Sequence, residues 1–132
     1  MVEGDKMNRK VGLWIDHTEA VIVSLTGNLG EVKSIPSEIE KYVRLSDGVQ
    51  KVSIEEMHNR RVNNHLKKYY DEVISLVKDA EAILIVGPGA AKFEFKKRLD
   101  GEKQNRRTVN LETADKMTDP QIAEKVRGYY SY

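Results

Sequence analysis

Two basic stretches carry the clearest chemical signal in this sequence. Between His58 and Lys68 there are four basic residues and no acidic one, and between Lys92 and Arg107 there are seven basic and three acidic residues. The whole chain has a formal net charge of only +1, so this positive charge is concentrated. The pattern indicates an anion-facing surface, although two ordinary solvated helix faces would explain it as well.

The side chains in these stretches are of the types that contact nucleic-acid backbones. Guanidinium and ammonium groups pair with phosphates, and the amides of Asn63 and Asn64 suit contacts with phosphate and sugar. We expect RNA to be contacted by Arg60, Arg61, Lys67, Lys68, Lys92, Lys96, Lys97 and Arg98.

Carboxylates at strand ends raise the alternative of a two-metal nuclease, which needs several of them to converge on two cations. Asp16 follows the first predicted strand, and Glu112 and Asp115 follow the last one. However, the central strand ends in Gly-Pro-Gly and supplies no carboxylate, and Asp16 is also a typical residue for capping a turn. We therefore expect no metal site.

The Gly87-Pro88-Gly89 turn could offer backbone N–H groups to a phosphate. It lacks the Lys-Ser/Thr pair of a P-loop and the third glycine of a dinucleotide fingerprint, and Pro88 has no N–H to donate. The three histidines are not at metal-ligand spacing, and there is no cysteine. The sequence therefore predicts a structural turn and no cofactor.

Hydrophobic patterning predicts the elements that position these residues. Apolar runs rich in β-branched residues indicate strands, and apolar residues at helical spacing indicate helices. The predicted strands cover residues 11–16, 20–25, 31–35, 82–86 and 107–111, and the predicted helices cover 53–78, 90–99 and a last helix that begins after Thr118. Residues 39–45 fit either a further strand or an extended cover segment.

Capping signals support these helices. Ser53 with Glu56 and Thr118 with Gln121 match the capping box, and Pro88 suits the first turn of the helix that follows it. The unbroken apolar run from Ala82 to Val86 indicates a strand buried on both faces. Trp14 is expected in the core, as is one tyrosine of each of the pairs at 69–70 and 129–130; the alternative is that these tyrosines stack on bases.

The element order β-β-β-α-β-α-β-α defines the fold class. It predicts an α/β domain with a ribonuclease-H-like mixed sheet of strand order 3-2-1-4-5 and helices on both faces, because a hairpin meander comes first and right-handed crossovers follow. We expect a single domain over residues 1–132 with a flexible N-terminus over residues 1–9.

Composition narrows the cellular setting. No apolar stretch approaches the roughly 20 residues that cross a bilayer, and the first residues lack the apolar core of a signal peptide. The absence of cysteine excludes a disulfide framework. We expect a cytoplasmic protein that does not bind membranes.

The residues of the first hairpin and of the central strand also carry a family resemblance. Residues 11–22 (VGLWIDHTEAVI) and residues 83–89 (ILIVGPG), with a long basic helix between them, resemble the middle domain of archaeal and eukaryotic class-1 peptide-chain release factors and Pelota. The resemblance spans residues 10–130 and includes short stand-alone bacterial members of this superfamily. It implies the same α/β fold and a role in translation.

In release factors, a Gly-Gly-Gln loop before the long helix enters the peptidyl-transferase centre and promotes hydrolysis of peptidyl-tRNA. The matching residues here are Gly48, Val49 and Gln50, and a β-branched valine does not readily take the backbone angles open to glycine. Pelota-type domains lack this motif and do not hydrolyse the ester, which makes them the nearer analogue.

These observations predict a non-catalytic module that binds RNA or the translation machinery, with tRNA or the ribosome as partner. Two alternatives remain open. One is a peptidyl-tRNA ester hydrolase that acts through Gln50, and the other is a protein-interaction or self-association module that uses the strand edge at residues 31–35 or the tyrosine-rich C-terminus.

Overall fold

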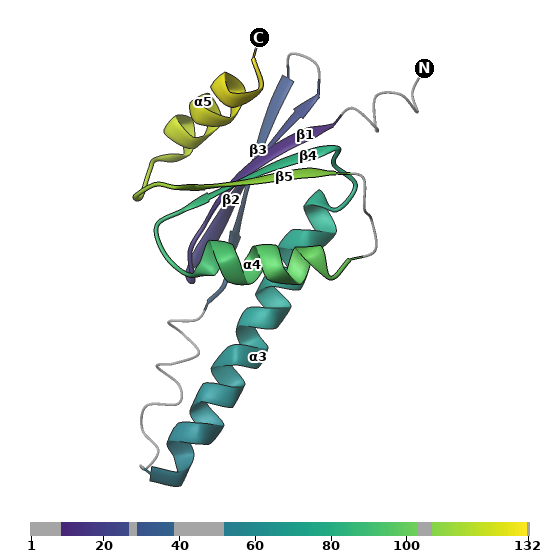
Figure 1. Ribbon diagram of the computed structural model, residues 1–132. Helices are drawn as coiled ribbons and strands as arrows, with labels where there is room; N and C mark the ends of the chain where they lie inside the picture. Colours follow the sequence, from purple (N-terminus) through teal and green to yellow (C-terminus); the bar gives the residue numbers. More distant parts are fainter. Residues whose placement is uncertain (1–8, 27–28, 39–51, 103–106, 132) are drawn as a thin grey trace.

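The computed structural model describes residues 9–26, 29–38, 52–102 and 107–131 (Figure 1). The elements follow the predicted order. The strands are β1 (Lys10–Ile15), β2 (Glu19–Thr26), β3 (Leu29–Pro36), β4 (Ala82–Gly87) and β5 (Thr108–Thr113), and the helices are α3 (Val52–Val77), α4 (Ala91–Asp100) and α5 (Asp119–Tyr130).

The strands form one mixed sheet in the order β3-β2-β1-β4-β5, which confirms the predicted topology. β2 pairs antiparallel with both β1 and β3, as expected for strands joined by tight turns. β4 runs parallel to β1 and to β5, so the chain must cross over through helices between these strands. β4 thus lies beside β1, and its residues Ile83–Gly87 are buried.

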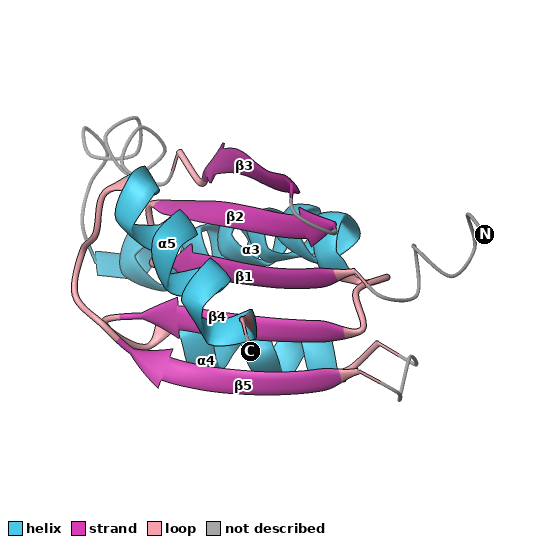
Figure 2. Ribbon diagram, turned by 90° about the horizontal axis from the view of Figure 1, so that it is seen from above, coloured by secondary structure: helices cyan, strands magenta, loops and turns pink. Residues whose placement is uncertain are grey.

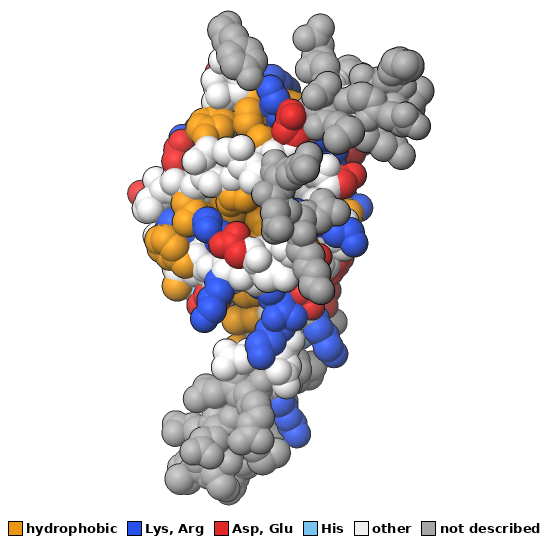
Figure 3. All heavy atoms as spheres, turned by 45° about the vertical axis from the view of Figure 1, so that its right-hand side comes forward, with side chains coloured by type: hydrophobic (Ala, Val, Ile, Leu, Met, Phe, Trp, Pro, Cys, Tyr) orange, Lys and Arg blue, Asp and Glu red, His pale blue; other side chains and the backbone are white. Residues whose placement is uncertain are grey.

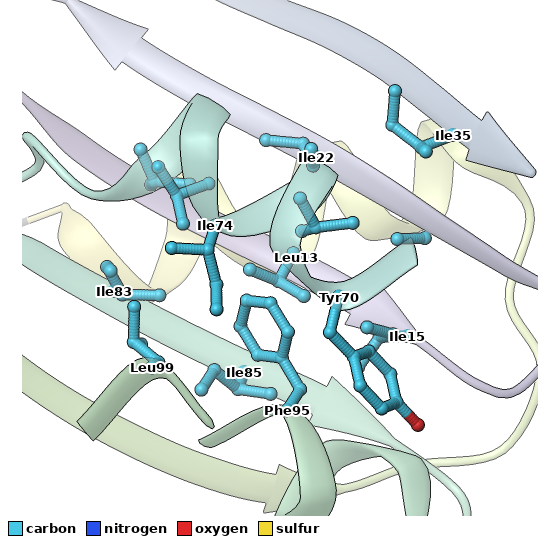
Figure 4. Packing of buried hydrophobic residues seen from close by; sticks show 14 of the residues in the cluster. Leu13, Ile15, Ile22, Ile35, Tyr70, Ile74, Ile83, Ile85, Phe95 and Leu99 are labelled. Carbon is cyan, nitrogen blue, oxygen red and sulfur yellow. The ribbon is translucent and has the colours of Figure 1, made fainter. Parts of the chain in front are cut away.

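Helices cover both faces of the sheet, as Figure 2 shows from above. Because strand side chains alternate between faces, β1 sends Leu13 to one face and Trp14 to the other. The larger core lies under α3 and α4, where Phe95 and Ile85 pack together (Figure 4). The smaller core lies under α5, where Trp14 is buried, as predicted.

Two glycines permit close packing at the centre of the molecule. A Cβ on Gly12 would lie 2.3 Å from Cγ2 of Val126, so α5 can rest directly on β1 only because Gly12 has no side chain. A Cβ on Gly87 would lie 2.3 Å from the carbonyl oxygen of Ile15, where the ends of β1 and β4 meet. The glycine of the predicted turn therefore has a structural role.

Among the side chains that the structure describes, those of α3 that pack in the core lie in its C-terminal half. Its contributions to the core start at Leu66 and continue through Tyr70 to Val77. The N-terminal half projects beyond α4 and away from the strands (Figure 1). The helix is therefore anchored at one end, and the basic residues near its middle lie where it leaves the body of the protein.

Several predicted details at element ends were wrong. α3 begins at Val52, so Ser53 lies inside the helix. α4 begins at Ala91 after Ala90 as N-cap, so Pro88 precedes the helix and is not in its first turn. β5 extends to Thr113 and therefore contains Glu112. The capping box of Thr118 and Gln121 is confirmed.

The predicted flexible N-terminus, apart from Arg9, lies outside the described residues, and so does the predicted strand or cover segment at residues 39–45. No helix in the described ranges combines the length and the apolar character that a membrane crossing needs.

Candidate nucleic-acid interface

α3 and α4 enclose an open groove of about 490 Å³ on one face of the protein. Residues of both predicted basic stretches line it, so the two stretches meet here. The lining residues are Asn63, Leu66, Lys67, Tyr70, Glu94, Lys97 and Arg98. Helical spacing explains the set, because residues three, four and seven apart share one face of a helix.

An ion pair joins the two walls of the groove. Arg98 Nε donates to Asp71 Oδ1 at 2.6 Å, and Arg98 Nη2 donates to Asp71 Oδ2 at 2.8 Å. Hydrogen bonding from Arg98 lowers the pKa of Asp71, and the same bond raises the pKa of Arg98. The pair fixes α4 beside α3, and it also neutralises part of the charge of Arg98.

Lys67 and Lys97 are the exposed cations of the groove, one on each helix. Within the part of the chain that the structure describes, neither takes part in an ion pair. Ammonium groups are of the type that pairs with phosphate oxygens, and here one stands on each wall of the groove.

Lys68 lies on the other side of α3. It lines a second, smaller depression of about 310 Å³, together with His65, Tyr69 and the carboxylates Glu38 and Glu72. This depression is therefore mixed in charge. The predicted cations of α3 consequently face in two directions, with Lys67 toward α4 and Lys68 toward the end of β3.

The structure corrects the predicted role of Lys92. This residue is 2% exposed, and its Nζ donates to the carbonyl oxygen of Gly89 at 2.8 Å. The ammonium closes the Gly87-Pro88-Gly89 turn onto α4, so Lys92 is not on the exposed face of that helix. Lys96 is half-buried and donates to Asp100 at 2.7 Å, one helical turn further on.

Arg61 is exposed on the part of α3 that leaves the body of the protein, and Arg60 belongs to the same turn of the helix. Figure 3 shows Lys and Arg side chains gathered on the lower part of the body, around the point where the helix emerges. The positive surface thus continues from the groove toward the projecting half of α3.

Two hydrogen bonds converge on Glu94 in the lining of the groove. Tyr70 Oη donates to Glu94 Oε1 at 2.6 Å, and His17 Nε2 lies 3.1 Å from the same oxygen. Burial, and then the hydrogen bond to Glu94, raise the pKa of Tyr70 above its usual range, so its phenol stays protonated. Glu94 therefore places a negative charge beside Lys97.

The tyrosine pairs were only partly predicted. Both Tyr69 and Tyr70 are buried, with 4% exposure each, which leaves neither ring free to stack on a base. The Tyr69 hydroxyl donates to the carbonyl oxygen of Asp16 at 3.0 Å. At the C-terminus, Tyr129 is 40% exposed, whereas Tyr130 packs against the core under α5.

Asp16 caps the turn that follows β1, which was the alternative to a role as a metal ligand in a nuclease. Its Oδ1 accepts hydrogen bonds from the backbone N–H of Thr18 and of Glu19 and from the Thr18 hydroxyl, all within 2.9 Å. Over the described ranges, no group of three or more His, Cys, Asp or Glu residues could hold a metal ion. Gln50, the weak catalytic candidate, lies outside the described residues.

Sequence reasoning missed the acidic members of this site, Asp71 and Glu94. A usable signal was present for Glu94, since it precedes Lys97 and Arg98 by three and four residues and so shares their helix face. For Asp71 no local signal exists, because its partner lies 27 residues away in the sequence.

The fold is similar to that of Pelota proteins of known structure. Pelota of Thermoplasma acidophilum superposes with a TM-score of 0.60 at 15% identity, and Pelota of Archaeoglobus fulgidus with 0.57 at 16%. The alignments cover 94% and 98% of this chain but 33% of each Pelota chain, so the protein spans about a third of their length.

An archaeal translation termination factor, aRF1, aligns over 89% of this chain and 37% of its own at 18% identity, with a TM-score of 0.47 that is too low to carry an inference. No protein-family model matches the sequence, and no curated protein matches it.

Proposed function

We propose that this protein is a single-domain, non-catalytic cytoplasmic module that binds RNA of the translation machinery through the groove between α3 and α4. The observation that carries the proposal is that Lys67 and Lys97, from two separate basic stretches, line one groove, and neither forms an ion pair with a carboxylate among the described residues. The fold shared with the two Pelota proteins agrees with the family resemblance of the sequence, from which we infer the link to translation.

The predicted cations differ in whether they are available to contact RNA. Lys67 and Lys97 form the centre of the proposed interface, and the exposed Arg61 extends it along α3, whereas Lys68 faces the second depression. Arg98 and Lys96 are engaged by Asp71 and Asp100, so they contribute positive potential but fewer direct contacts.

Backbone recognition fits this arrangement better than base recognition. The lining offers ammonium, guanidinium and amide groups, which position a phosphate–sugar backbone, whereas Tyr69 and Tyr70 are buried and offer no stacking surface. We therefore expect binding with little sequence preference and with strong dependence on salt.

The test measures the affinity of the whole chain for tRNA and for ribosomes as a function of salt concentration. The Lys67→Glu/Lys97→Glu variant is expected to bind at least tenfold more weakly at low salt. Affinity falls as salt rises, and each lost phosphate contact makes the slope of log affinity against log salt less steep by about 0.7–0.9. The loss of two contacts should therefore reduce the steepness by about 1.5.

The matched control is Lys125→Glu/Arg127→Glu on α5, which changes the net charge equally on the opposite face of the sheet (Figure 2). Lys125 pairs with Glu112 at the surface, where such pairs contribute little to stability. Absence of binding at low salt, or equal losses in both variants, would contradict the proposed interface.

A further inference from the structure

β3 forms an open edge of the sheet. Its register against β2 runs from Glu19↔Pro36 to Thr26↔Leu29, and no other strand in the described ranges pairs with its outer side. Residues 30–34 are exposed, and Val32 has a relative exposure of 43%. An exposed edge of this length offers unpaired N–H and C=O groups to another strand.

The side chains of this edge alternate in a particular way. Val32 lies opposite Val23, on the face of the sheet that α5 covers. Lys33 lies opposite Ile22, on the face that α3 and α4 cover, and Glu31 shares that face because it is two residues away. An apolar residue thus stands on one face between two opposite charges on the other.

We propose that β3 pairs antiparallel with β3 of a second copy of this chain, about a two-fold axis that passes through Val32. A two-fold axis perpendicular to the sheet keeps each face on its own side, so paired residues must belong to the same face. The axis therefore passes through a residue, and each candidate residue defines one register.

Charge selects among these registers. An axis through Glu31 or through Lys33 would place two like charges directly opposite each other, which is unfavourable. An axis through Val32 places Glu31 of each copy opposite Lys33 of the other and brings the two exposed valines together. Of these three registers, the one centred on Val32 is therefore the one that pairs opposite charges.

The other edge of the sheet lacks this property. β5 contains one charged residue, Glu112, and its carboxylate already pairs with Lys125 at 2.7 Å. Because the complementarity of β3 is to its own sequence, a second copy is the occupant that it fits. Strand pairing alone buries a small area, so the dimer is weak and depends on concentration.

Sedimentation equilibrium of the whole chain tests the pairing. The wild type should show a reversible monomer–dimer equilibrium. Glu31→Lys and Lys33→Glu should each raise the dimer dissociation constant about tenfold or more, because each replaces two attractive pairs by two repulsive ones. Circular dichroism checks that these exposed substitutions leave the fold intact.

Two compensating experiments separate charge pairing from general damage. A mixture of the Glu31→Lys and Lys33→Glu variants should form a heterodimer, since each copy then supplies the charges that the other lacks. The double variant Glu31→Lys/Lys33→Glu should self-associate like the wild type. A wild type that stays monomeric, or a dimer that tolerates both single variants, overturns the proposal; RNA binding through the groove is independent of either result.

Discussion

Arg98 and Asp71 form a two-point hydrogen bond that connects α4 to α3 across 27 residues of sequence. The pair is exposed on its outer side, with 37% and 55% of the two side chains accessible. It therefore stabilises the protein by about 0.2–1 kcal/mol, the range typical of exposed ion pairs.

This pair predicts a particular acid dependence of stability. Because the pKa of Asp71 is lower in the folded protein than in the unfolded chain, the stability that it contributes is lost as the pH falls below about 4. Asp71→Asn should lower the stability at pH 7 slightly and flatten its loss on acidification, as measured by urea unfolding at several pH values. An unchanged acid limb in the variant would contradict this account.

The buried tyrosines affect how the stability of the protein changes at alkaline pH. Burial is the largest of the causes that raise the pKa of Tyr69, Tyr70 and Tyr130, so the folded protein holds these phenolic protons more tightly than the unfolded chain does. Stability should therefore fall as the pH rises above about 10.

Phenylalanine at these positions should reduce the alkaline loss, which urea unfolding between pH 8 and 11 would measure. Tyr70→Phe should in addition cost about 1 kcal/mol at neutral pH, because the hydrogen bond to Glu94 is lost. An alkaline limb that all three substitutions leave unchanged would exclude these tyrosines as its source.

The carboxylate of Glu94 should weaken the binding of RNA in the groove, because it places a negative charge in the lining. Glu94→Gln removes a carboxylate that lies beside Lys97 in the lining of the groove, and the amide can still accept from Tyr70. Affinity for tRNA at low salt should rise about threefold to tenfold, and the gain should shrink at high salt. Glu112→Gln, on the opposite side of the sheet near α5, makes the same charge change and should have a smaller effect.

Substitution by alanine should affect stability very differently at Gly87 and at Gly89, which belong to the same turn. Gly87→Ala would force a Cβ against the carbonyl oxygen of Ile15, and we expect a loss of about 2–3 kcal/mol, typical of overpacking against backbone. Gly89→Ala meets no atom within 4 Å and should change stability little. Thermal unfolding of the two variants measures the contrast, and equal losses would refute the close approach of β1 and β4.

Gln50 predicts the outcome of a catalytic assay. If the module is non-catalytic, it should not accelerate hydrolysis of peptidyl-tRNA on ribosomes, and Gln50→Ala should behave as the wild type does. Hydrolysis that depends on Gln50 would show instead that Val49 is tolerated in place of glycine.

The sheet could be predicted from sequence because its signals are local and long. The five apolar residues at 82–86 and the hairpin around Asp16 indicate their structures without reference to the rest of the chain. The groove could not be predicted, since it depends on the angle at which α4 lies beside α3 and on the pairing of Arg98 with Asp71.

The burial of Lys92 could have been predicted from its helical spacing, but its charge favoured the opposite prediction. It follows Ala91 and precedes Phe95 by three residues, so helical spacing places it on the buried side of α4 with these two residues and Leu99. Charge alone favoured an exposed position. The long apolar stem of a lysine allowed the burial, and the carbonyl group of Gly89 received the ammonium.

The half of α3 that is not anchored gives the protein a reach that its body lacks. From Val52 to the residue before Leu66, the helix extends about 20 Å at about 1.5 Å per residue. A single helix is only about 10–12 Å wide with its side chains. A large partner can therefore contact this half of α3 without touching the sheet.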